Sequence, residues 1–403
     1  MCAKKTFRIT TGIHKKKKLY PLFSLIKCEK LSIFNSTKIS SDDDVILLTR
    51  KENATSKTSY HELNPFIAIS DTRIDAFYQA KVRIDSKMSV DIVFICSKNE
   101  GNFWFTVFTE LMTSAYNWKL EIPDNYQAKY EENFLHEITN FLSSYIPKDE
   151  LVILKSNIID ESLFNHGFST RKGGLSTARG VASLNITPAN IKRDSALIGI
   201  ENVRRLGLKA GFNYKNFVKA QAVHGNTVYV FGKDVPRDGY DCIVSNERNV
   251  TIAAPGADCV MMVFADSVTQ SFGACHSGWK GTLAKACLET IEKMRDEYGA
   301  KYENIKIALG PCIGPCCLEF DKKDADLFKS INEKSVIWKE GKEKPFIDLR
   351  LVNRTLLESV GVLPSHIDDT TVTLCTSCHP ELFFSYRRDK IPFGNQVGFI
   401  GLR

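Results

Sequence analysis

The stretch that decides the fold is residues 260–309, which read VMMVFADSVTQSFGACHSGWKGTLAKACLETIEKMRDEYGAKYENIKIAL. It begins with an apolar run at 260–264 and ends with another at 305–309, and each run has the length and composition of a buried strand. Between them, residues 281–298 place apolar side chains at helical spacing. The stretch therefore predicts a strand, a helix and a second strand that pack around one core.

The same alternation continues on both sides of this stretch. Further apolar runs occupy residues 227–231 and 372–375, and further helix-like stretches occupy residues 194–207, 321–331 and 350–360. Strand and helix patterns that alternate in this way are typical of a sheet covered by helices. We therefore expect an α+β fold for residues 151–403, with a mixed β-sheet layered with α-helices.

The N-terminal part of the chain is organised differently. It contains an apolar segment at 90–94, an aromatic run at 103–105 and an amphipathic helix pattern at 131–145. It carries no dense motif, and a chain of 403 residues is long enough for two domains. We expect a smaller α/β domain at residues 1–150, whose role is open and which could bind a protein partner, followed by the domain at 151–403.

The distribution of charge argues against nucleic-acid binding. The formal net charge is +7, but residues 1–20 carry seven Lys or Arg and no acid, so the remaining residues sum to zero. A body without net charge does not indicate nucleic-acid binding. The four lysines at 15–18 could form a nuclear address, although a solvated chain end is the simpler interpretation.

The lack of recognisable targeting segments in the sequence gives the expected location. No run approaches the about 18 apolar residues that a membrane span needs, and the first residues lack the apolar core of a secretory signal. We expect a soluble, intracellular protein of the cytoplasm, with the nucleus or the peroxisome as alternatives. The twelve cysteines should then be thiols, metal ligands or nucleophiles and not disulfides.

Three residues in the second half suggest a metal site. His224, Cys259 and His276 each lie at the end of an apolar run and near a glycine, where a strand would give way to a loop. Two histidines and one cysteine suit Zn²⁺, and three protein ligands leave a fourth position for water or substrate. Their separations of 35 and 17 residues match no local zinc finger. The residues alone also fit a buried cysteine and two hydrogen-bonded histidines.

Two cysteine-rich segments resemble parts of a structural zinc knuckle. They read CIGPCC at 312–317 and CTSC at 375–378. Nearly sixty residues separate them, and both are embedded in apolar sequence. The sequence therefore favours ordinary thiols at these positions.

Several cations lie in segments that suit an anion. Arg171 is part of the glycine-rich segment 167–176, and Lys280 precedes the helix pattern at 281–298. Arg387 and Arg388 follow two phenylalanines, a combination that suits a heterocycle or a phosphate. Glycine turns, an ordinary helix start and an edge strand are the alternative interpretations.

Together these segments resemble the laccase-domain, YfiH-like family over about residues 150–403. The motifs, in order, are GFSTRKGGLS at 167–176, AVHG at 222–225, ADCV at 257–260, HSGWKG at 276–281, GPCIGPCC at 310–317, DLR at 348–350, CTSC at 375–378 and FFSYRRD at 383–389. The two-part chain is similar to the animal members. One departure is Lys280, where many bacterial members have Arg, so the two-pronged grip of Arg on phosphate is lost.

The resemblance implies an activity and assigns roles to residues. It implies a zinc-dependent purine nucleoside phosphorylase that converts adenosine, inosine, guanosine and methylthioadenosine with phosphate, and that also deaminates adenosine. His224, Cys259 and His276 are then the zinc ligands. The cations that would hold phosphate or substrate are Arg171, Lys280, Arg387 and Arg388. Asp258 is either a proton carrier or the partner of a ligand histidine.

The histidine count argues against copper. The family carries a multicopper label, and a multicopper oxidase needs about ten histidine ligands, mostly in His-X-His pairs. This chain has eight histidines, and no two of them are two residues apart. A four-copper site cannot be built from them. Three alternatives stay open: a cysteine hydrolase or deamidase with Cys259 as nucleophile and His276 as base, a redox enzyme, and a scaffold without catalysis.

Overall fold

The computed structural model describes residues 6–11, 44–50, 66–70, 72–86, 91–186, 194–235 and 238–403. The four lysines at 15–18 lie outside these ranges. The chain divides into two compact units, one of residues 1–146, 177–179 and 188–201 and one of residues 147–176, 180–187 and 202–403. No helix among the described residues is long and apolar enough to cross a membrane.

The N-terminal unit is built on a parallel five-stranded sheet. Its elements are β1 (Thr6–Thr11), β2 (Asp44–Arg50), β3 (Phe66–Ser70), α1 (Arg73–Ser86), β4 (Asp91–Ile95), α2 (Gly101–Leu111), β5 (Asn117–Glu121) and α3 (Leu135–Ser144). The strand order is β3-β2-β1-β4-β5, and all four pairings are parallel. The expected α/β character is confirmed, and this strand order is that of doubly wound sheets.

An aromatic core holds this unit together. Phe94 of β4 lies against Trp104 and Phe108 of α2, with ring centroids 4.8 and 5.0 Å apart. Phe77 of α1 reaches Phe108 at 5.0 Å. All four rings are fully buried. The aromatic run seen in the sequence is therefore the core of this unit.

The second unit contains two sheets and a larger set of elements. Its strands are β6 (Ile153–Leu154), β7 (Phe164–Ser169), β8 (Phe217–Lys219), β9 (Val228–Val230), β10 (Cys242–Ser245), β11 (Thr251–Gly256), β12 (Val260–Asp266), β13 (Ser271–Ser277), β14 (Ile305–Leu309), β15 (Val336–Ile337), β16 (Phe346–Ile347), β17 (Ile367–Asp368) and β18 (Gln396–Leu402). Its helices are α5 (Trp279–Leu283), α6 (Ala286–Tyr298), α7 (Lys322–Lys329), α8 (Leu349–Ser359) and α9 (Tyr386–Asp389). Helix α4 (Ala196–Ala210) crosses the boundary between the units.

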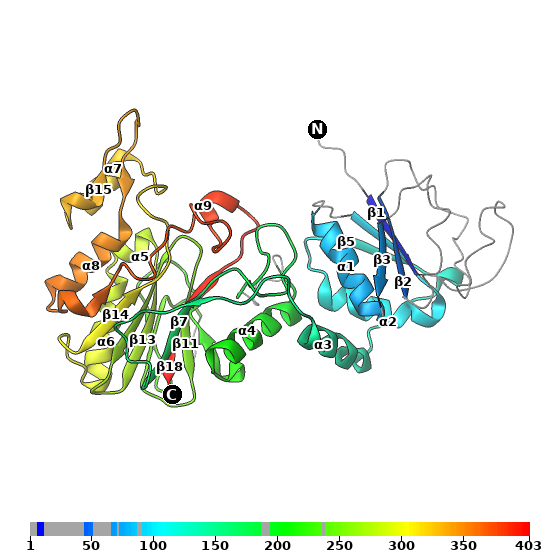
Figure 1. Ribbon diagram of the computed structural model, residues 1–403, viewed down its shortest axis with the longest axis horizontal. Helices are drawn as coiled ribbons and strands as arrows, with labels where there is room; N and C mark the ends of the chain where they lie inside the picture. Colours follow the sequence, from blue (N-terminus) through cyan, green and yellow to red (C-terminus); the bar gives the residue numbers. More distant parts are fainter. Residues whose placement is uncertain are drawn as a thin grey trace. The chain divides into compact units, whose positions relative to one another are not determined.

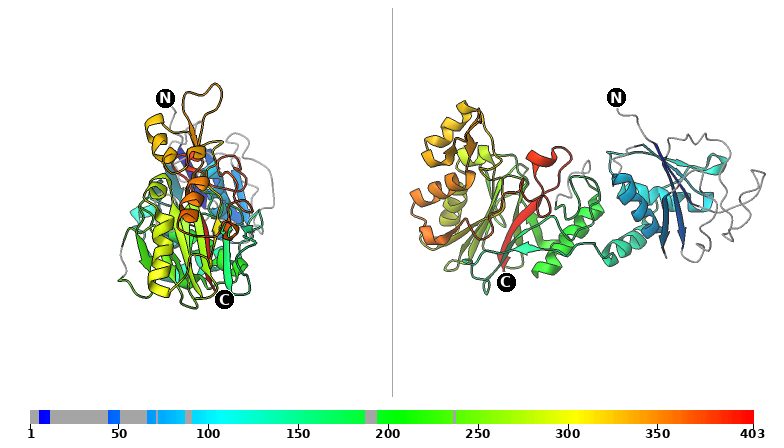
Figure 2. Two further views of the ribbon diagram at one scale, coloured as in Figure 1. Left: turned by 90° about the vertical axis from the view of Figure 1, so that its left-hand side faces the viewer. Right: turned by 45° about the horizontal axis from the view of Figure 1, so that its top comes forward.

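The two main sheets pack face to face (Figures 1 and 2). One has the order β17-β14-β12-β13-β10-β9 and the other β6-β7-β18-β11-β8, and both mix parallel with antiparallel pairs. Their shared core contains Phe168 and Ile400 from the second sheet and Met261, Val263 and Phe272 from the first. Side chains of successive strand residues alternate between faces, so the other face of each sheet needs its own cover.

Helices supply that cover. Ile291 and Met294 of α6 and Leu356 of α8 join the core on the outer face of the six-stranded sheet. Val203 and Leu206 of α4 pack on the five-stranded sheet from its other side. The unit is thus a two-sheet sandwich between helical layers, which confirms the α+β class and adds a second sheet to the expected one.

The helix pattern at 281–298 is divided in the structure. Lys285 adopts a φ of 60°, a left-handed conformation that ends α5, and α6 begins at Ala286. Gly299, at φ 73°, then terminates α6. The apolar run at 372–375 forms only an isolated bridge between Cys312 and Cys375. The strand expected there is replaced by β17, a few residues earlier.

Candidate metal centre

The three candidate ligands come together at one edge of the six-stranded sheet. Cys259 directly precedes β12, and His276 lies near the end of β13, where Met261 is its partner across the antiparallel pair. His224 comes from the loop between β8 and β9. One ligand atom of each residue lies within 4.8 Å of the others. The hairpin register therefore places two donors side by side, and the loop supplies the third.

A buried carboxylate supports these donors. Asp241, just before β10, is fully buried and accepts a hydrogen bond from Nδ1 of His276 at 2.8 Å. The same carboxylate accepts the backbone N–H groups of His224 at 2.9 Å and Gly225 at 2.8 Å. His224 has a φ of 65°, and these bonds hold the strained turn that presents it. Asp241 thus orients one ligand ring and positions the loop of another.

A glycine leaves the space between the donors open. A Cβ added at Gly278 would lie 2.8 Å from Sγ of Cys259 and 3.2 Å from Cδ2 of His224. Any other residue would therefore press its Cβ against the Cys259 thiol and the His224 ring. The φ of Gly278 is −71°, so space and not backbone conformation requires the glycine.

The donors perturb one another electrostatically. Burial raises the pKa of the Cys259 thiol, but the charge of His276 and hydrogen bonds from His224 and His276 outweigh burial and bring it to about 6. Burial lowers the pKa of His276, whereas the Cys259 thiolate and the Asp241 carboxylate raise it to about 10. Cys259 is therefore favoured as the thiolate, the form that binds a metal.

The donor set fits a metal ion. One thiolate and two imidazoles, with space beside them and a carboxylate behind one imidazole, match the requirements of a three-ligand site that keeps a coordination position open. His224 is exposed, Cys259 is partly buried and His276 is buried, so the site is reached from one side. Among the described residues these three form one of two groups able to hold a metal.

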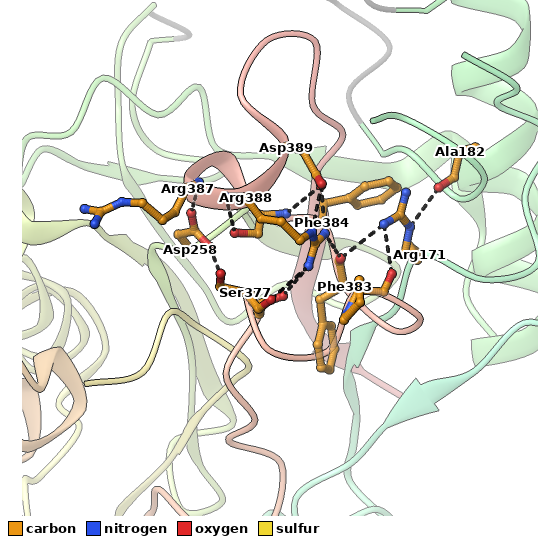
Figure 3. A network of polar contacts seen from close by, with 12 residues as sticks. Arg171, Ala182, Asp258, Ser377, Phe383, Phe384, Arg387, Arg388 and Asp389 are labelled. Carbon is orange, nitrogen blue, oxygen red and sulfur yellow. Dashed lines mark hydrogen bonds and ion pairs between the residues drawn. The ribbon is translucent and has the colours of Figure 1, made fainter. Parts of the chain in front are cut away.

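The hydrogen bonds of the Asp258 carboxylate stabilise a turn and do not orient a ligand histidine. Its carboxylate accepts the hydroxyl of Thr376 at 2.7 Å and the backbone N–H of Arg387 at 2.6 Å (Figure 3). Its φ of 101° is rare for a residue with a side chain. The prediction that Asp258 could be the partner of a ligand histidine is wrong, because the carboxylate bonded to His276 is that of Asp241. These contacts fix the strained turn that ends at Cys259.

The guanidinium group of Arg171 is bound to backbone carbonyls. Its Nε donates to Ala182 at 2.9 Å, and its Nη1 donates to Pro380 at 2.9 Å and to Phe383 at 3.5 Å. The group also lies 4.8 Å from the ring centroid of Phe384. These contacts favour a role in joining chain segments over the expected role in holding phosphate.

Arg388 shares one of those partners. Its Nη2 donates to the carbonyl of Phe383 at 2.7 Å and pairs with Asp389, while its Nη1 donates to Thr376 at 2.8 Å (Figure 3). The Arg387 side chain extends away from this network and donates weakly to the carbonyl of Cys317 at 3.3 Å. Arg388, like Arg171, is therefore engaged by the protein itself.

Of the cations expected to hold phosphate, Lys280 is engaged least by the protein itself. It is exposed and lies two residues after Gly278, in the first turn of α5. Its Nζ lies 5.4 Å from the ring centroid of Trp279. Its charge is therefore exposed, four residues along the chain from His276.

The chain is similar to known proteins over most of its length. Residues 165–403 match the family model described as multi-copper polyphenol oxidoreductase laccase. The mouse purine nucleoside phosphorylase LACC1 is 44% identical over 276 residues, which are 68% of this chain and 63% of the mouse protein. The human protein of the same name is 37% identical over 345 residues, 81% of this chain and 79% of its own. The chain thus covers less than two thirds of the mouse relative.

A prokaryotic relative and a solved structure extend the similarity. The adenosine deaminase RL5 from an unknown prokaryotic organism is 27% identical over 235 residues, 55% of this chain and 87% of its own. The crystal structure of YlmD from Geobacillus stearothermophilus superimposes with a TM-score of 0.53 at 30% identity, covering 60% of this chain and 92% of that one. The shared part of the chain is therefore that of the two-sheet unit.

Proposed function

The chain belongs to the multi-copper polyphenol oxidoreductase laccase family, and from this membership we propose that it is a zinc-dependent purine nucleoside phosphorylase. The observation that carries the proposal is the convergence of ligand atoms of His224, Cys259 and His276, with Gly278 leaving room beside two of them. The mouse and human relatives, whose names state this activity, support the choice of reaction.

Zinc is the metal that best suits the donor set. A mixed thiolate and imidazole site with three protein ligands is typical of catalytic zinc. When bound there, zinc supplies Lewis acidity toward a substrate oxygen or a water molecule. Copper oxidation is disfavoured, since among the described residues only two histidines, His224 and His276, belong to a group that could hold a metal.

The proposed reaction transfers a ribosyl group to phosphate. A phosphate oxygen forms a bond to C1′ of the ribose while the bond from C1′ to N9 of the purine breaks, and the released base takes up a proton. The products are the free base and ribose 1-phosphate for adenosine, inosine or guanosine, and adenine and 5-methylthioribose 1-phosphate for methylthioadenosine. The ammonium group of Lys280 would hold the phosphate, since its charge is exposed and it follows the ligand His276 by four residues.

Adenosine deamination at the same centre is a second proposed activity. It needs water in place of phosphate and releases ammonia from the purine carbon that carries the amino group. The similarity to a protein named adenosine deaminase supports it. Because both reactions would use the same zinc but only one uses phosphate, residues that bind phosphate should separate them.

One observation favours a different class of enzyme. Asp241, His276 and Cys259 lie in the order of a carboxylate, a base and a thiol nucleophile, as in a cysteine hydrolase. A cysteine hydrolase or deamidase is therefore the second candidate. Such an enzyme has no use for His224 as a third donor and needs no phosphate, so the phosphate requirement distinguishes the two candidates.

We expect release of base from adenosine or inosine to depend on phosphate. Omitting phosphate should reduce the rate to near the background, because no other nucleophile in the proposed reaction attacks C1′. Chromatography of the products with and without phosphate measures this, and ribose 1-phosphate should form in equal amount to the free base. Equal base release in phosphate-free buffer would instead identify a nucleoside hydrolase.

We expect Lys280→Gln to raise the KM for phosphate and to reduce phosphorolysis by roughly ten- to a hundredfold. A hydrogen bond to a charged group contributes about 1.5–3 kcal/mol, which corresponds to that range. Adenosine deamination should fall much less, since it uses no phosphate. Lys301→Gln, which changes an exposed lysine beyond α6, is the matched control and should leave both rates unchanged. Equal losses in both reactions would contradict a phosphate contact.

A further inference from the structure

Four cysteines form a cluster that the proposed function does not use. Sγ atoms of Cys316, Cys317, Cys375 and Cys378 all lie within 4.8 Å of one another. The first two belong to the loop that follows β14, and the last two belong to a turn that follows β17, about sixty residues later. All four are free thiols in the structure. The fold thus gathers into one place the segments that are far apart in the sequence.

The distances suit a tetrahedral metal site. Sγ of Cys378 lies 3.5 Å from that of Cys316 and 3.4 Å from that of Cys317. Bonds of about 2.3 Å from zinc to sulfur, in tetrahedral geometry, place sulfurs about 3.8 Å apart. Two of the sulfur–sulfur distances are slightly shorter than this value, and none exceeds 4.8 Å. A disulfide needs about 2.05 Å, so the four sulfurs converge on a point without being paired.

We propose that Cys316, Cys317, Cys375 and Cys378 bind a zinc ion through four thiolates, separately from the centre at His224, Cys259 and His276. Four cysteine ligands leave no open position, which is the arrangement of a structural zinc site. The spacing of two residues between Cys375 and Cys378 is common in such sites. The adjacent pair Cys316 and Cys317 completes the set from the other loop.

The backbone around the cluster is arranged for thiolates. The N–H of Gly314 donates to Sγ of Cys375 at 3.3 Å, and such a bond stabilises negative charge on sulfur. A Cβ added at Gly314 would lie 3.2 Å from Sγ of Cys316 and 3.3 Å from Cβ of Cys375. A glycine therefore lets the two segments approach without pressing on either cysteine.

Two further contacts join the loops beside the cluster. The N–H of Thr376 donates to the carbonyl of Cys312 at 3.0 Å, and the N–H of Cys312 donates to Leu374 at 3.3 Å. They form the isolated bridge between Cys312 and Cys375. The ligand segments are thus held in place by the protein itself, so that zinc would bind to a largely formed site.

Nearby cations would offset the negative charge of four thiolates on one zinc. Nζ of Lys339 donates to the carbonyl of Cys316 at 3.1 Å. Nη1 of Arg387 donates to the carbonyl of Cys317 at 3.3 Å. Two positive groups therefore lie beside the backbone of the cluster, where they would offset the negative charge of a zinc bound to four thiolates.

The position of the cluster gives the zinc a structural role. The turn between Cys375 and Cys378 contains Thr376, whose hydroxyl binds the Asp258 carboxylate. Asp258 directly precedes Cys259, a ligand of the first centre. A zinc bound to the four cysteines would fix this turn against the loop after β14, and through Thr376 it would help to hold the strained residue beside the first metal.

The metal content of the full-length chain tests the proposal. Purified in the presence of zinc, the wild type should contain about two zinc ions per chain, and the double variant Cys316→Ser/Cys378→Ser about one. The control is Cys312→Ala, which removes a buried thiol just outside the cluster and should keep both ions. An unchanged zinc content in the double variant would overturn the proposal.

A second measurement avoids the risk that the double variant fails to fold. Cys316 and Cys378 are exposed, so iodoacetamide should modify them quickly unless a metal protects them. In the zinc-loaded wild type we expect at least about tenfold slower modification of both than after treatment with a chelator, measured by peptide mass spectrometry. Equal rates in the two states, or disulfides among the four cysteines in freshly isolated protein, would overturn the proposal. Neither readout uses the enzymatic activity, so this test fails or succeeds independently of the proposed function.

Discussion

Cys259→Ala should lower the zinc content by one ion per chain and reduce phosphorolysis at least about a thousandfold, with the fold intact. Zinc contributes several kcal/mol to the stabilisation of developing charge, and each 1.36 kcal/mol changes the rate tenfold. His276→Ala and His224→Ala should have the same effect, because the three donors come from separate segments and none can be replaced by another. Deamination should fall with phosphorolysis, since both need the metal.

The fold should survive because the donors sit at a sheet edge and not in the core. The strand β12, which Cys259 directly precedes, and the strand β13, which carries His276, are held by a continuous antiparallel ladder. Elemental analysis measures the zinc, and circular dichroism with thermal melting measures the fold. The matched control is Cys275→Ala, the fully buried neighbour of His276 on the opposite face of β13, which should lose some stability but no zinc. Full zinc content in Cys259→Ala would rule out this centre.

Local patterns were sufficient to predict most helices. The pattern at 350–360 became α8, whose first residues are capped by the Asp348 side chain through the N–H groups of Arg350 and Leu351. The strands were harder. The strand β13, which reads SFGACHS, and β18, which reads QVGFIGL, are rich in small residues and carry no alternation of polar and apolar positions.

These strands depend on partners that a sequence does not display. A Cβ added at Gly398 of β18 would lie 2.7 Å from the ring of Phe168, so the glycine matches a ring more than two hundred residues away. The second sheet of the sandwich is built from such pairings. Strand lengths and composition alone therefore predicted one sheet and not two.

The sequence likewise indicated some residues of the site and missed others. The motif resemblance pointed to His224, Cys259 and His276, and the structure brings these three residues together. Asp241 had no pattern around it, because its role arises only when β10 pairs with β13 and brings its carboxylate to His276. The four-cysteine cluster was disfavoured by its sequence separation, which the bridge between Cys312 and Cys375 overcomes.

For the arginines, the sequence suggested a role that the structure does not favour. In the sequence, Arg171 and Arg388 are charged groups among glycines and aromatics, which suits a phosphate. In the structure both donate to the same carbonyl, that of Phe383. Whether a guanidinium group faces a ligand or the backbone depends on the path of loops, and no local pattern contains that information.

Asp241→Asn should weaken zinc binding and reduce activity by roughly ten- to a hundredfold, the range typical for carboxylates that orient a ligand histidine. The asparagine amide has the same shape as the carboxylate, but an NH₂ group, which is a hydrogen-bond donor, replaces one of the two carboxylate oxygens. Oδ1 of Asp241 accepts from both Nδ1 of His276 and the N–H of His224, and Oδ2 accepts the N–H of Gly225, so an NH₂ group at either position would face a donor. The variant therefore loses either the bond that orients the His276 ring together with one to the His224 turn, or the bond to Gly225 that holds this turn, and in both cases a ligand is less well positioned.

The measurement for Asp241→Asn is zinc affinity by competition with a chelator, together with kcat and KM at saturating zinc. Excess zinc should restore part of the activity, because the ligands themselves remain, and a variant that is only unstable would not respond in this way. Asp266→Asn is the matched control: Asp266 is equally buried, but it lies at the other end of the hairpin of β12 and β13, where it accepts the N–H of Val268. It should lose stability without losing zinc affinity. If both variants bound zinc as tightly as the wild type, the carboxylate of Asp241 would serve the fold alone, and the histidine would be oriented by the metal and its own strand.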